Sequence, residues 1–526
     1  MSLFKAFLKR TGLEEKPFQG ECFQWCLYRE QAGLAPLGGI LALEMGLGKT
    51  IIMLALMECN FKYHTLIVVP LSLLNQWEKI IQKQFGHQPL VYHGTKPKNM
   101  QLSLEEIKGK PIVLTTYGQV AMPSEKQLEN GKKLSLLHSL TWDRIICDEG
   151  HHVSHKKTNE YKGVAALKKQ ICWLVTGTPI QNNEKELYNL FGLLGLNAGA
   201  MHYKDEANYT ETVQKYVYHK TKTEANIILP PLQEHIIMVQ WENESERHFS
   251  SHIHSMLPFC NVPRESLAEE IAGTEDPRAL RMKYLSKARQ VCIHLPILQQ
   301  TIKHFEMLYK RQTSGAGTSA SASAAGTSAS ASASASIDFA ELYVSESKIN
   351  ALVKTLLERK DNGCGKIVFC HYYAEIDIIA KRLLEKYGDK KKVIKLDGRV
   401  PHSQRHKLLS EPADVLLAQI KMCREGLNLQ DNYSEVYFTS PDFNPAMEDQ
   451  AIARCWRIGQ SKAVNVFRYA MASEAAGDTP PAQQAGPPFL SEAIPSVATA
   501  YNLDSYSIKL QNKKREFIAK MANVQT

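Results

Sequence analysis

The sequence predicts an α/β protein with two parallel-sheet domains, and three observations support this fold class. Short apolar runs alternate with helical patterns between about residues 38 and 176, and again between 366 and 468. Such alternation is typical of parallel sheets. A tract of only Ser, Ala, Gly and Thr, residues 314–336, separates the two sets and cannot form a core. At 526 residues, the chain is also too long for one hydrophobic core.

The apolar runs give the expected strands. The first covers residues 38–42 and is followed by a glycine turn and a helix that begins near 51–57. Residues 200–310 show helical spacing without clear alternation, and 505–521 form a charged helical pattern. The other expected strands are 65–70, 111–116, 144–147, 172–176, 366–370, 393–396, 415–418, 436–439 and 464–468.

These patterns give a domain plan. We expect a first α/β lobe, a helical insertion, a flexible Ser/Ala linker, a second lobe, a disordered Ala/Pro-rich segment and a C-terminal helix. Their expected ranges are 1–200, 201–313, 314–336, 337–471, 472–499 and 500–526, respectively.

Composition excludes several classes of protein. No run of 18 apolar residues is present and the N-terminus lacks an apolar core, so we expect neither a membrane span nor a secretory signal. The 11 cysteines are scattered without a Cys-x-x-Cys pair, which favours reduced intracellular thiols over disulfides or zinc. Lys and Arg exceed Asp and Glu by 63 to 54, giving a net charge of +9 that suits a polyanionic partner.

Residues Gly46-Leu47-Gly48-Lys49-Thr50 have the layout of a nucleotide phosphate loop. Glycines let backbone N–H groups approach phosphate oxygens, and the following helix N-terminus adds its dipole. Lys49 would reach the β- and γ-phosphates, and Thr50 would hold Mg²⁺. The full pattern needs glycine at position 43, where the chain has leucine, so a plain turn is the alternative.

Asp148-Glu149 directly follows the apolar run 144–147. Two carboxylates at the end of a strand suit Mg²⁺ and water. Asp148 would contact the metal bound to ATP, and Glu149 would orient and deprotonate the attacking water. A solvated turn is the alternative, but the phosphate loop about 100 residues upstream favours the functional interpretation.

Taken in order, these and further motifs resemble those of the Snf2 family of superfamily 2 helicase-like ATPases. TGTPIQNN and R-x-x-R-I-G-Q are the most specific. The resembling segments are PFQ (17–19), GGILALEMGLGKT (38–50), LIVVPLSLLNQW (66–77), IVLTTYG (112–118), WDRIICDEGH (142–151), LVTGTPIQNN (174–183), KIVFCHY (366–372), LDG (396–398), GLNL (426–429) and DQAIARCWRIGQ (449–460).

The resemblance implies two RecA-like lobes around a split ATP site, with ATP and Mg²⁺ as cofactors. Arg454 and Arg457, three residues apart on an expected helix, would reach the γ-phosphate from the second lobe. The implied catalytic residues are Lys49, Asp148, Glu149, His151, Gln450, Arg454 and Arg457. The implied nucleotide-binding residues are Gln19, Met45, Gly46, Leu47, Gly48, Lys49 and Thr50, with Thr50 and Asp148 at the metal. The implied coupling residues are Thr176, Gly177, Thr178 and Gly426, and the nucleic-acid contacts are Ser72, Thr115, Thr116, Tyr117, His371 and Lys421.

Some features narrow or weaken the comparison. Gly150 and the segment 288–294 resemble the Rad5/Rad16-like branch, but no zinc-ligand cluster marks a RING finger. The compact length of the chain also resembles that of family members encoded by large DNA viruses. Both a cellular and a viral origin therefore stay open. Leu43 replaces the usual Asp, placing an apolar side chain beside the phosphate loop. Cys423, Arg424 and Trp456 also depart from the family pattern.

The resemblance implies an ATP-dependent translocase on duplex DNA that remodels or displaces protein–DNA complexes in chromatin, repair or transcription. Nucleosomes or other DNA-bound proteins are the expected partners, and the protein is expected to be a monomer. We expect it in the nucleus if cellular, or in the nucleus or a cytoplasmic replication site if viral. The alternatives are a weakly hydrolysing, ATP-gated DNA-binding scaffold and a transcription-release ATPase.

Overall fold

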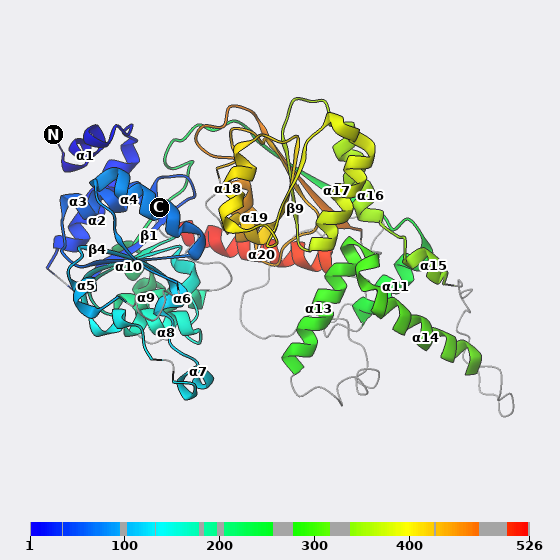
Figure 1. Ribbon diagram of the computed structural model, residues 1–526, viewed down its shortest axis with the longest axis horizontal. Coiled ribbons are helices and arrows are strands. Elements are labelled where there is room, and N and C mark those ends of the chain that lie inside the picture. The colour runs from blue at the N-terminus through cyan, green and yellow to red at the C-terminus, as the bar shows by residue number, and fades with distance from the viewer. Residues whose placement is uncertain are drawn as a thin grey trace.

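The computed structural model describes residues 2–33, 35–94, 102–131, 133–177, 184–196, 205–255, 277–315, 337–424, 428–472 and 502–523. Most of the expected Ser/Ala linker 314–336 and of the Ala/Pro-rich segment 472–499 lies outside these ranges. Two α/β bodies stand side by side, the first in blue and cyan and the second in yellow and orange (Figure 1). Among the described residues, no helix is both long and apolar enough to cross a membrane.

The first lobe contains a seven-stranded sheet in the order β3-β4-β2-β5-β6-β1-β7. Every neighbouring pair of strands is parallel. Its central strands are nearly all apolar, as expected when helices cover both faces of a sheet. The strands are β1 Leu37–Leu43, β2 Thr65–Val69, β3 Leu90–Tyr92, β4 Ile112–Thr116, β5 Thr141–Asp148, β6 Lys168–Val175 and β7 Val217–Lys220.

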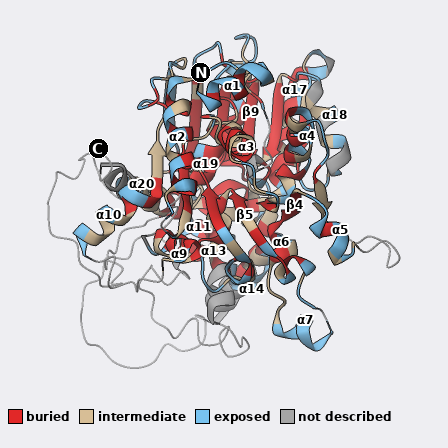
Figure 2. Ribbon diagram, turned by 90° about the vertical axis from the view of Figure 1, so that its left-hand side faces the viewer, coloured by how far each residue is buried: buried red, intermediate tan, exposed pale blue. Residues whose placement is uncertain are grey.

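Helices cover both faces of this sheet, and the strands between them are buried (Figure 2). One core contains residues from α1–α4, and the opposite core contains residues from α5, α6 and α8–α10. The helices are α1 Leu3–Thr11, α2 Pro17–Gln31, α3 Lys49–Cys59, α4 Leu74–Phe85, α5 Leu104–Lys108, α6 Tyr117–Val120, α7 Glu125–Glu129, α8 Asn159–Ala166, α9 Glu184–Leu194 and α10 Glu206–Tyr216.

The second lobe contains a six-stranded parallel sheet in the order β10-β11-β9-β12-β13-β8. Its strands are β8 Leu232–Val239, β9 Lys366–Cys370, β10 Val393–Leu396, β11 Val415–Gln419, β12 Glu435–Phe438 and β13 Val464–Met471. Its helices are α11 Glu244–Ser255, α13 Pro277–Ile293, α14 Gln299–Gly315, α15 Phe339–Leu342, α16 Ser347–Glu358, α17 Tyr373–Tyr387, α18 His402–Ser410, α19 Pro445–Ile452 and α20 Leu503–Asn523.

The expectation of two parallel α/β sheets is therefore confirmed, and every expected strand is present within a few residues. Strands β3, β7 and β8 were not predicted. The helical spacing predicted over about 200–310 is wrong in two places, because β7 is an edge strand of the first sheet and β8 is an edge strand of the second. The sequence signal of β8 is weak because this edge strand is exposed along most of its length. Apolar and polar residues therefore do not alternate along it.

The strand order places the functional loops together. Strands β1, β6 and β5 are neighbours, so their carboxyl ends lie at one edge of the first sheet. In parallel α/β sheets, ligands bind at this edge. The phosphate loop, Thr176-Gly177 and Asp148-Glu149 all follow these three strands.

Candidate functional site

The phosphate loop connects β1 to α3. Gly46 and Gly48 have φ angles of +90° and +82°, a region that favours glycine. Gln19 on α2 donates from Nε2 to the Leu47 carbonyl at 3.1 Å. A Cβ atom at Gly48 would lie 2.4 Å from that Nε2, so Gln19 packs against the loop only because residue 48 is glycine.

Lys49 opens α3, and its Nζ donates to the Leu43 carbonyl at 2.9 Å. Burial lowers the pKa of Lys49, while the nearby carboxylates of Glu149 and Asp148 oppose that shift. The sequence predicts that the Leu43 side chain lies beside the loop, and the structure places it in the same core as Leu47 of the loop. The Leu43 side chain is fully buried in the core with α1–α4, because strand geometry turns it inward while its carbonyl faces Lys49.

The carboxylate of Asp148 is held at the end of β5 by two donors. Trp77 Nε1 on α4 donates to Oδ2 at 2.7 Å, and the Glu149 backbone N–H donates to Oδ1 at 3.0 Å. Burial and the adjacent Glu149 charge raise the pKa of Asp148 to about 6, although Trp77 and Lys49 act in the opposite direction. Trp77 is the last residue of the segment 66–77, and no local sequence pattern reveals its hydrogen bond to Asp148.

Glu149 has the opposite electrostatic environment. Burial raises its pKa, but His151, Lys49 and Arg454 outweigh burial and lower it to about 2. Its Oε2 lies 3.3 Å from His151 Nδ1 and accepts no well-aligned hydrogen bond from a described residue. Glu149 also has a φ of 52°, an uncommon angle for a residue other than glycine. Such local strain occurs often at functional sites.

Thr176 and Gly177, after β6, lie between the phosphate loop and the acids. Thr176 donates its backbone N–H to the Leu41 carbonyl at 3.0 Å, and its Oγ1 lies 3.4 Å from His151 Nδ1. A Cβ atom at Gly177 would lie 3.3 Å from Lys49 Nζ. The two residues therefore touch both halves of the first-lobe site. Thr178 and Gly426, the other expected coupling residues, lie outside the described residues.

Arg454 and Arg457 face this site from the second lobe. The expectation that they lie on a helix is wrong, because α19 ends at Ile452 and both follow it in a turn. A Cβ atom at Gly46 would lie 3.7 Å from Arg457 Cβ, and the Arg454 charge acts on the pKa values of Lys49 and Glu149. Both arginines are therefore close to the phosphate loop.

Three further predicted residues lie in this region. Gln450 is buried on α19, four residues before Arg454. Met45 lines the space beside Gly177, with its Cγ 3.0 Å from a Cβ built there. Thr50 lies in the first turn of α3, next to Lys49, where a metal bound to phosphates would be within the reach of its hydroxyl.

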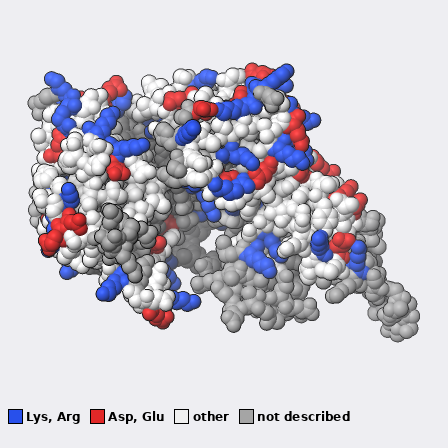
Figure 3. Space-filling view, in the orientation of Figure 1, with Lys and Arg blue, Asp and Glu red and all other residues white. Residues whose placement is uncertain are grey.

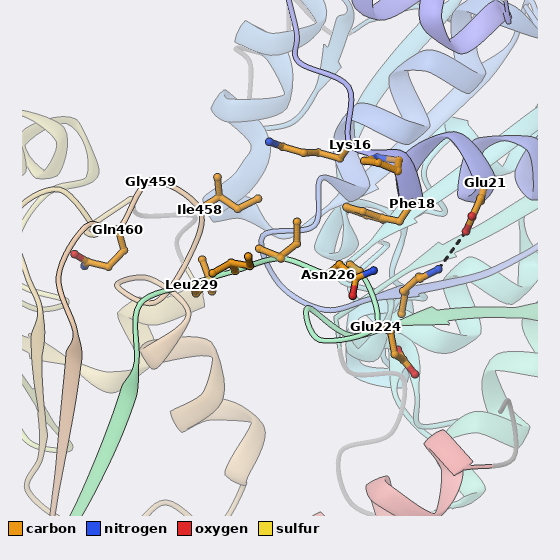
Figure 4. A pocket seen from close by; sticks show the side chains of 14 residues that line it. Lys16, Phe18, Glu21, Glu224, Asn226, Leu229, Ile458, Gly459 and Gln460 are labelled. Atoms are coloured by element: carbon orange, nitrogen blue, oxygen red, sulfur yellow. Dashed lines mark hydrogen bonds and ion pairs between the residues drawn. The ribbon is translucent and has the colours of Figure 1, made fainter.

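An open pocket of about 490 Å³ lies between the lobes. Pro17 and Phe18 contribute from α2, residues 224–229 from the segment between the sheets, and Ile458, Gly459 and Gln460 from the second lobe. Figure 4 shows side chains from all three segments around it, with the Lys220–Glu21 ion pair at one side. Pro17 and Phe18, which line the pocket on the first lobe, directly precede Gln19. Ile458, Gly459 and Gln460, which line it on the second lobe, directly follow Arg457.

The expected nucleic-acid contacts are placed unevenly. Thr115 and Tyr117 are buried: Thr115 Oγ1 donates to the Tyr92 carbonyl at 2.8 Å, and the Tyr117 hydroxyl donates to the Asp148 carbonyl at 2.6 Å. Thr116 is also buried and its Oγ1 lies 3.2 Å from His93 Nδ1, while His371 Nε2 lies 3.2 Å from the Ser440 carbonyl. Ser72 lies just after β2, and Lys421 is exposed after β11.

The burial of Thr115, Thr116 and Tyr117 gives these side chains a structural role in place of the surface role expected for them. The hydrogen bond from the Tyr117 hydroxyl to the Asp148 carbonyl helps to hold the Asp148 backbone in place. Ser72 and Lys421 stay candidates for contacts with a polyanion. Figure 3 shows Lys and Arg side chains on both lobes, mixed with acidic ones.

The oxygen atoms of Asp148 and Thr50 fit a magnesium ion that is bound mainly by the phosphates of a nucleotide. Among the described residues, no group of three or more His, Cys, Asp or Glu residues could form a complete metal cage. Mg²⁺ commonly takes one or two protein ligands and completes its shell with phosphates and water. Asp148 at the end of β5 and Thr50 in the first turn of α3 match that requirement.

Comparisons with known proteins agree with this geometry. Residues 18–297 match the SNF2-related domain family, and residues 347–459 match the helicase conserved C-terminal domain family. The chain is 24% identical to "DNA excision repair protein ERCC-6-like" of Danio rerio, covering 89% of this chain and 35% of that protein. It is 26% identical to "Probable global transactivator" of Orgyia pseudotsugata multicapsid polyhedrosis virus, covering 85% of this chain and 84% of that protein. DNA repair proteins of the RAD5 type are also among its relatives.

The chain therefore spans about a third of the length of the ERCC-6-like relative. In structure it is similar to the helicase domain of Pyrococcus furiosus Hef, with a TM-score of 0.50 and 15% identity over 87% of this chain and 95% of that one. That similarity supports the two-lobed fold.

Proposed function

This chain belongs to the SNF2-related family of helicase-like ATPases, and from that premise we propose that it hydrolyses ATP to move along duplex DNA. In doing so it would remodel or displace proteins bound to the DNA. The observation that carries the proposal is the split site: Lys49, Asp148 and Glu149 on one lobe face Arg454 and Arg457 on the other.

In this proposal, each lobe supplies a different part of the chemistry. Lys49 and the backbone N–H groups of the phosphate loop bind the β- and γ-phosphates. Glu149 is ionised at neutral pH, its pKa lowered to about 2, so its carboxylate can accept a hydrogen bond from the attacking water and orient it, taking the proton as the phosphoryl group is transferred. Arg454 and Arg457 stabilise the charge that develops on the transferred phosphoryl group.

Thr50 and Asp148 would hold Mg²⁺, which would neutralise phosphate charge when bound. Asp148 is suited to this task because the hydrogen bond from Trp77 fixes the orientation of its carboxylate. The nucleotide base and ribose would occupy the 490 Å³ pocket, whose walls come from both lobes. Bound ATP would then contact both lobes at once and favour their closure.

Coupling to DNA would pass through Thr176 and Gly177, which contact both the lysine and the His151–Glu149 pair. Phosphate contacts from Ser72 and Lys421 would hold duplex DNA without reading its sequence. The net charge of +9 and the DNA-related names of several relatives support this partner. We propose that the protein acts as a monomer in the nucleus or, if viral, at a site of viral replication.

One argument for the alternative function, a weakly hydrolysing ATP-gated DNA-binding scaffold, is weakened by the position of Leu43. This alternative depends partly on Leu43 disturbing the phosphate loop, but that side chain is in the core and its carbonyl binds Lys49. Cys423 and Arg424, its other supports, lie in a short 3-10 turn after β11. A motor is therefore the function that the site supports best.

The test is ATP turnover with and without duplex DNA, for the wild type and Glu149→Gln. We expect DNA to stimulate the wild type, and the substitution to reduce kcat by about 10³-fold while ATP binding persists. Triplex displacement without unwinding of a forked duplex would support translocation. ATP turnover that is the same with and without DNA, or that is unchanged by Glu149→Gln, would contradict the motor proposal and favour the scaffold.

A further inference from the structure

Lys222 lies in the segment that connects the two sheets, just after β7. The surrounding turn is well defined: the Thr221 N–H donates to Glu224 Oε2 at 2.6 Å, and the Ala225 N–H donates to the Thr221 carbonyl at 3.0 Å. Lys222 is only 5% exposed. Lysine is rarely buried unless its ammonium group is paired, so the contacts of this residue need an explanation.

On the first lobe, Lys222 binds both oxygens of Glu44. Its backbone N–H donates to Oε2 at 2.7 Å, and its Nζ lies 2.8 Å from Oε1. Glu44 directly follows β1, and its carbonyl accepts the Leu47 N–H at 3.2 Å. The carboxylate that holds Lys222 is therefore part of the start of the phosphate loop.

On the second lobe, Lys222 contacts Trp456. Its Nζ lies 4.4 Å from the centroid of the indole ring and donates to the Trp456 carbonyl at 3.4 Å. The indole Nε1 donates in turn to the Pro230 carbonyl at 2.8 Å. The connecting segment thus holds Trp456 at two points, and Trp456 stands between Arg454 and Arg457 in the chain.

We propose that Lys222 is a positioning residue that holds the Arg454–Arg457 turn against the phosphate loop during ATP hydrolysis. The inference deepens the proposed function and rests on it for the catalytic readout. One ammonium group joins the acid at the loop entrance to the turn that carries both arginines. Because a partly desolvated ammonium–indole contact and two hydrogen bonds meet at one point, the bridge fixes direction as well as distance.

The bridge should act on kcat more than on KM. Nucleotide binding depends mainly on the phosphate loop, whereas the arginines act on charge that develops in the transition state. Lys222→Met keeps the apolar stem and removes the charge. We expect it to lower DNA-stimulated kcat by about tenfold with less than a twofold change in KM for ATP, the scale of one lost charged interaction.

Two variants sharpen this experiment. Lys222→Arg retains a cation that can reach the indole and Glu44, so it should recover most of the lost kcat. Lys215→Met is the matched control, because Lys215 also lies over an aromatic ring, 5.6 Å from Tyr216, but within the first lobe. It should leave kcat unchanged. Lys222→Met with wild-type kcat, or an equal loss in Lys215→Met, would overturn the proposal.

A double-mutant cycle separates positioning from general stability. If Lys222 acts through Trp456, adding Trp456→Leu to Lys222→Met should lower kcat no further than the more damaging single change. Additive losses would overturn the inference.

A distance measurement covers the case in which the wild type proves inactive, which would defeat the proposed function but not this bridge. Spin labels carried by non-natural residues at exposed Glu129 and Glu385 would report the separation of the lobes. We expect Lys222→Met to broaden that distance distribution without nucleotide, and Lys215→Met to leave it unchanged. An unchanged distribution in Lys222→Met would refute the bridge whatever the activity.

Discussion

Asp148 and Glu149 show how one dipeptide can hold two carboxylates in different states. Asp148 is buried beside a second negative charge, so its neutral form is favoured. Glu149, beside His151, Lys49 and Arg454, favours its ionised form despite burial. Opposite pKa shifts in adjacent acids are a recurring way to separate roles within one site. In the proposed function, the ionised Glu149 would orient the attacking water and the Asp148 carboxylate would hold the metal ion bound to ATP.

This difference makes stability depend on pH through Asp148. Its pKa is about 6 when folded against an ordinary value near 3.8, so the folded state binds the proton more tightly. Stability is therefore lost as pH rises from about 4 to 6. At pH 8, Asp148→Asn should raise the free energy of unfolding by about 1–2 kcal/mol, since it removes a buried charge but keeps an acceptor for Trp77.

Thermal unfolding at pH 5 and pH 8 checks this expectation. The advantage of Asp148→Asn should be smaller at pH 5, where much of the wild-type carboxylate is protonated, and the variant should lose ATP hydrolysis at both values. Asp361→Asn, at an exposed surface acid, is the control and should follow the wild type. An advantage that grows on acidification would contradict the assigned direction of the pKa shift.

Leu43 is a core residue at the end of β1, and this decides what substitutions there should do. Leu43→Ala should cost about 2–5 kcal/mol of stability through lost packing, while turnover per folded molecule stays close to normal. Leu43→Asp would bury a carboxylate among apolar side chains and should be more destabilising. Measuring the unfolding midpoint and kcat together tests this. A large kcat loss in a fully folded Leu43→Ala protein would instead place the side chain at the nucleotide.

The sequence indicates the candidate catalytic residues more readily than the residues that hold them in place. Glycines, Lys49 and the two acids are recognisable because their chemistry restricts residue type at fixed spacing. Tyr117 and Trp77 act through single long-range hydrogen bonds to Asp148, which no local pattern reveals. The contacts of Lys222 span more than 170 residues to Glu44 and more than 230 to Trp456, so they were equally invisible.

At the scale of elements, α20 packs against the second lobe through a buried polar network. Asp504, at its start, pairs with Lys348 on α16, accepts from Ser440 Oγ at 2.7 Å and accepts from the Met471 N–H at 2.9 Å. Further along, Arg515 pairs with Asp449 at 3.1 Å on the surface. Figure 1 shows this helix, in red, running beneath the second lobe toward the first.

The two ion pairs of α20 should differ sharply in strength. Asp504→Ala leaves the Lys348 ammonium buried without its counter-charge and should cost about 3–5 kcal/mol. Arg515→Ala breaks an exposed pair and should cost less than about 1 kcal/mol. Hydrogen exchange along α20 should accelerate strongly in the first variant alone. Equal protection in both variants would show that apolar packing, and not this network, secures the helix.

The misplaced elements have a common physical cause. Strands β7 and β8 are stabilised by pairing with strands far away in sequence, so tertiary contacts override weak local preference. Arg454 and Arg457 continue the helical spacing of α19, but the chain leaves the helix after Ile452. Helix ends are the least predictable boundaries because the last turn depends on what it meets.

For the whole molecule, the ATP site exists only where the lobes meet. In the proposed function, the first lobe would bind the phosphates and orient the attacking water, and Arg454 and Arg457 of the second lobe would supply positive charge for the transition state. Lobe arrangement therefore controls chemistry, and anything that shifts it, such as a nucleotide or a DNA duplex, would change turnover. A ligand can shift such an equilibrium only by its difference in affinity between the two arrangements.

Arg457→Ala tests this dependence directly. We expect kcat to fall by about 10³-fold, the scale of arginine effects in related phosphoryl transfers, with ATP affinity altered only slightly. ATP turnover and equilibrium binding of a labelled nucleotide would be measured on the same preparation. Lys462→Ala is the matched control, because Lys462 is a nearby cation of the second lobe whose Nζ donates to the Gly363 carbonyl at 2.7 Å. If Arg457→Ala weakened binding and turnover equally, the arginine would serve to bind nucleotide, and hydrolysis would not require the second lobe to complete the transition state.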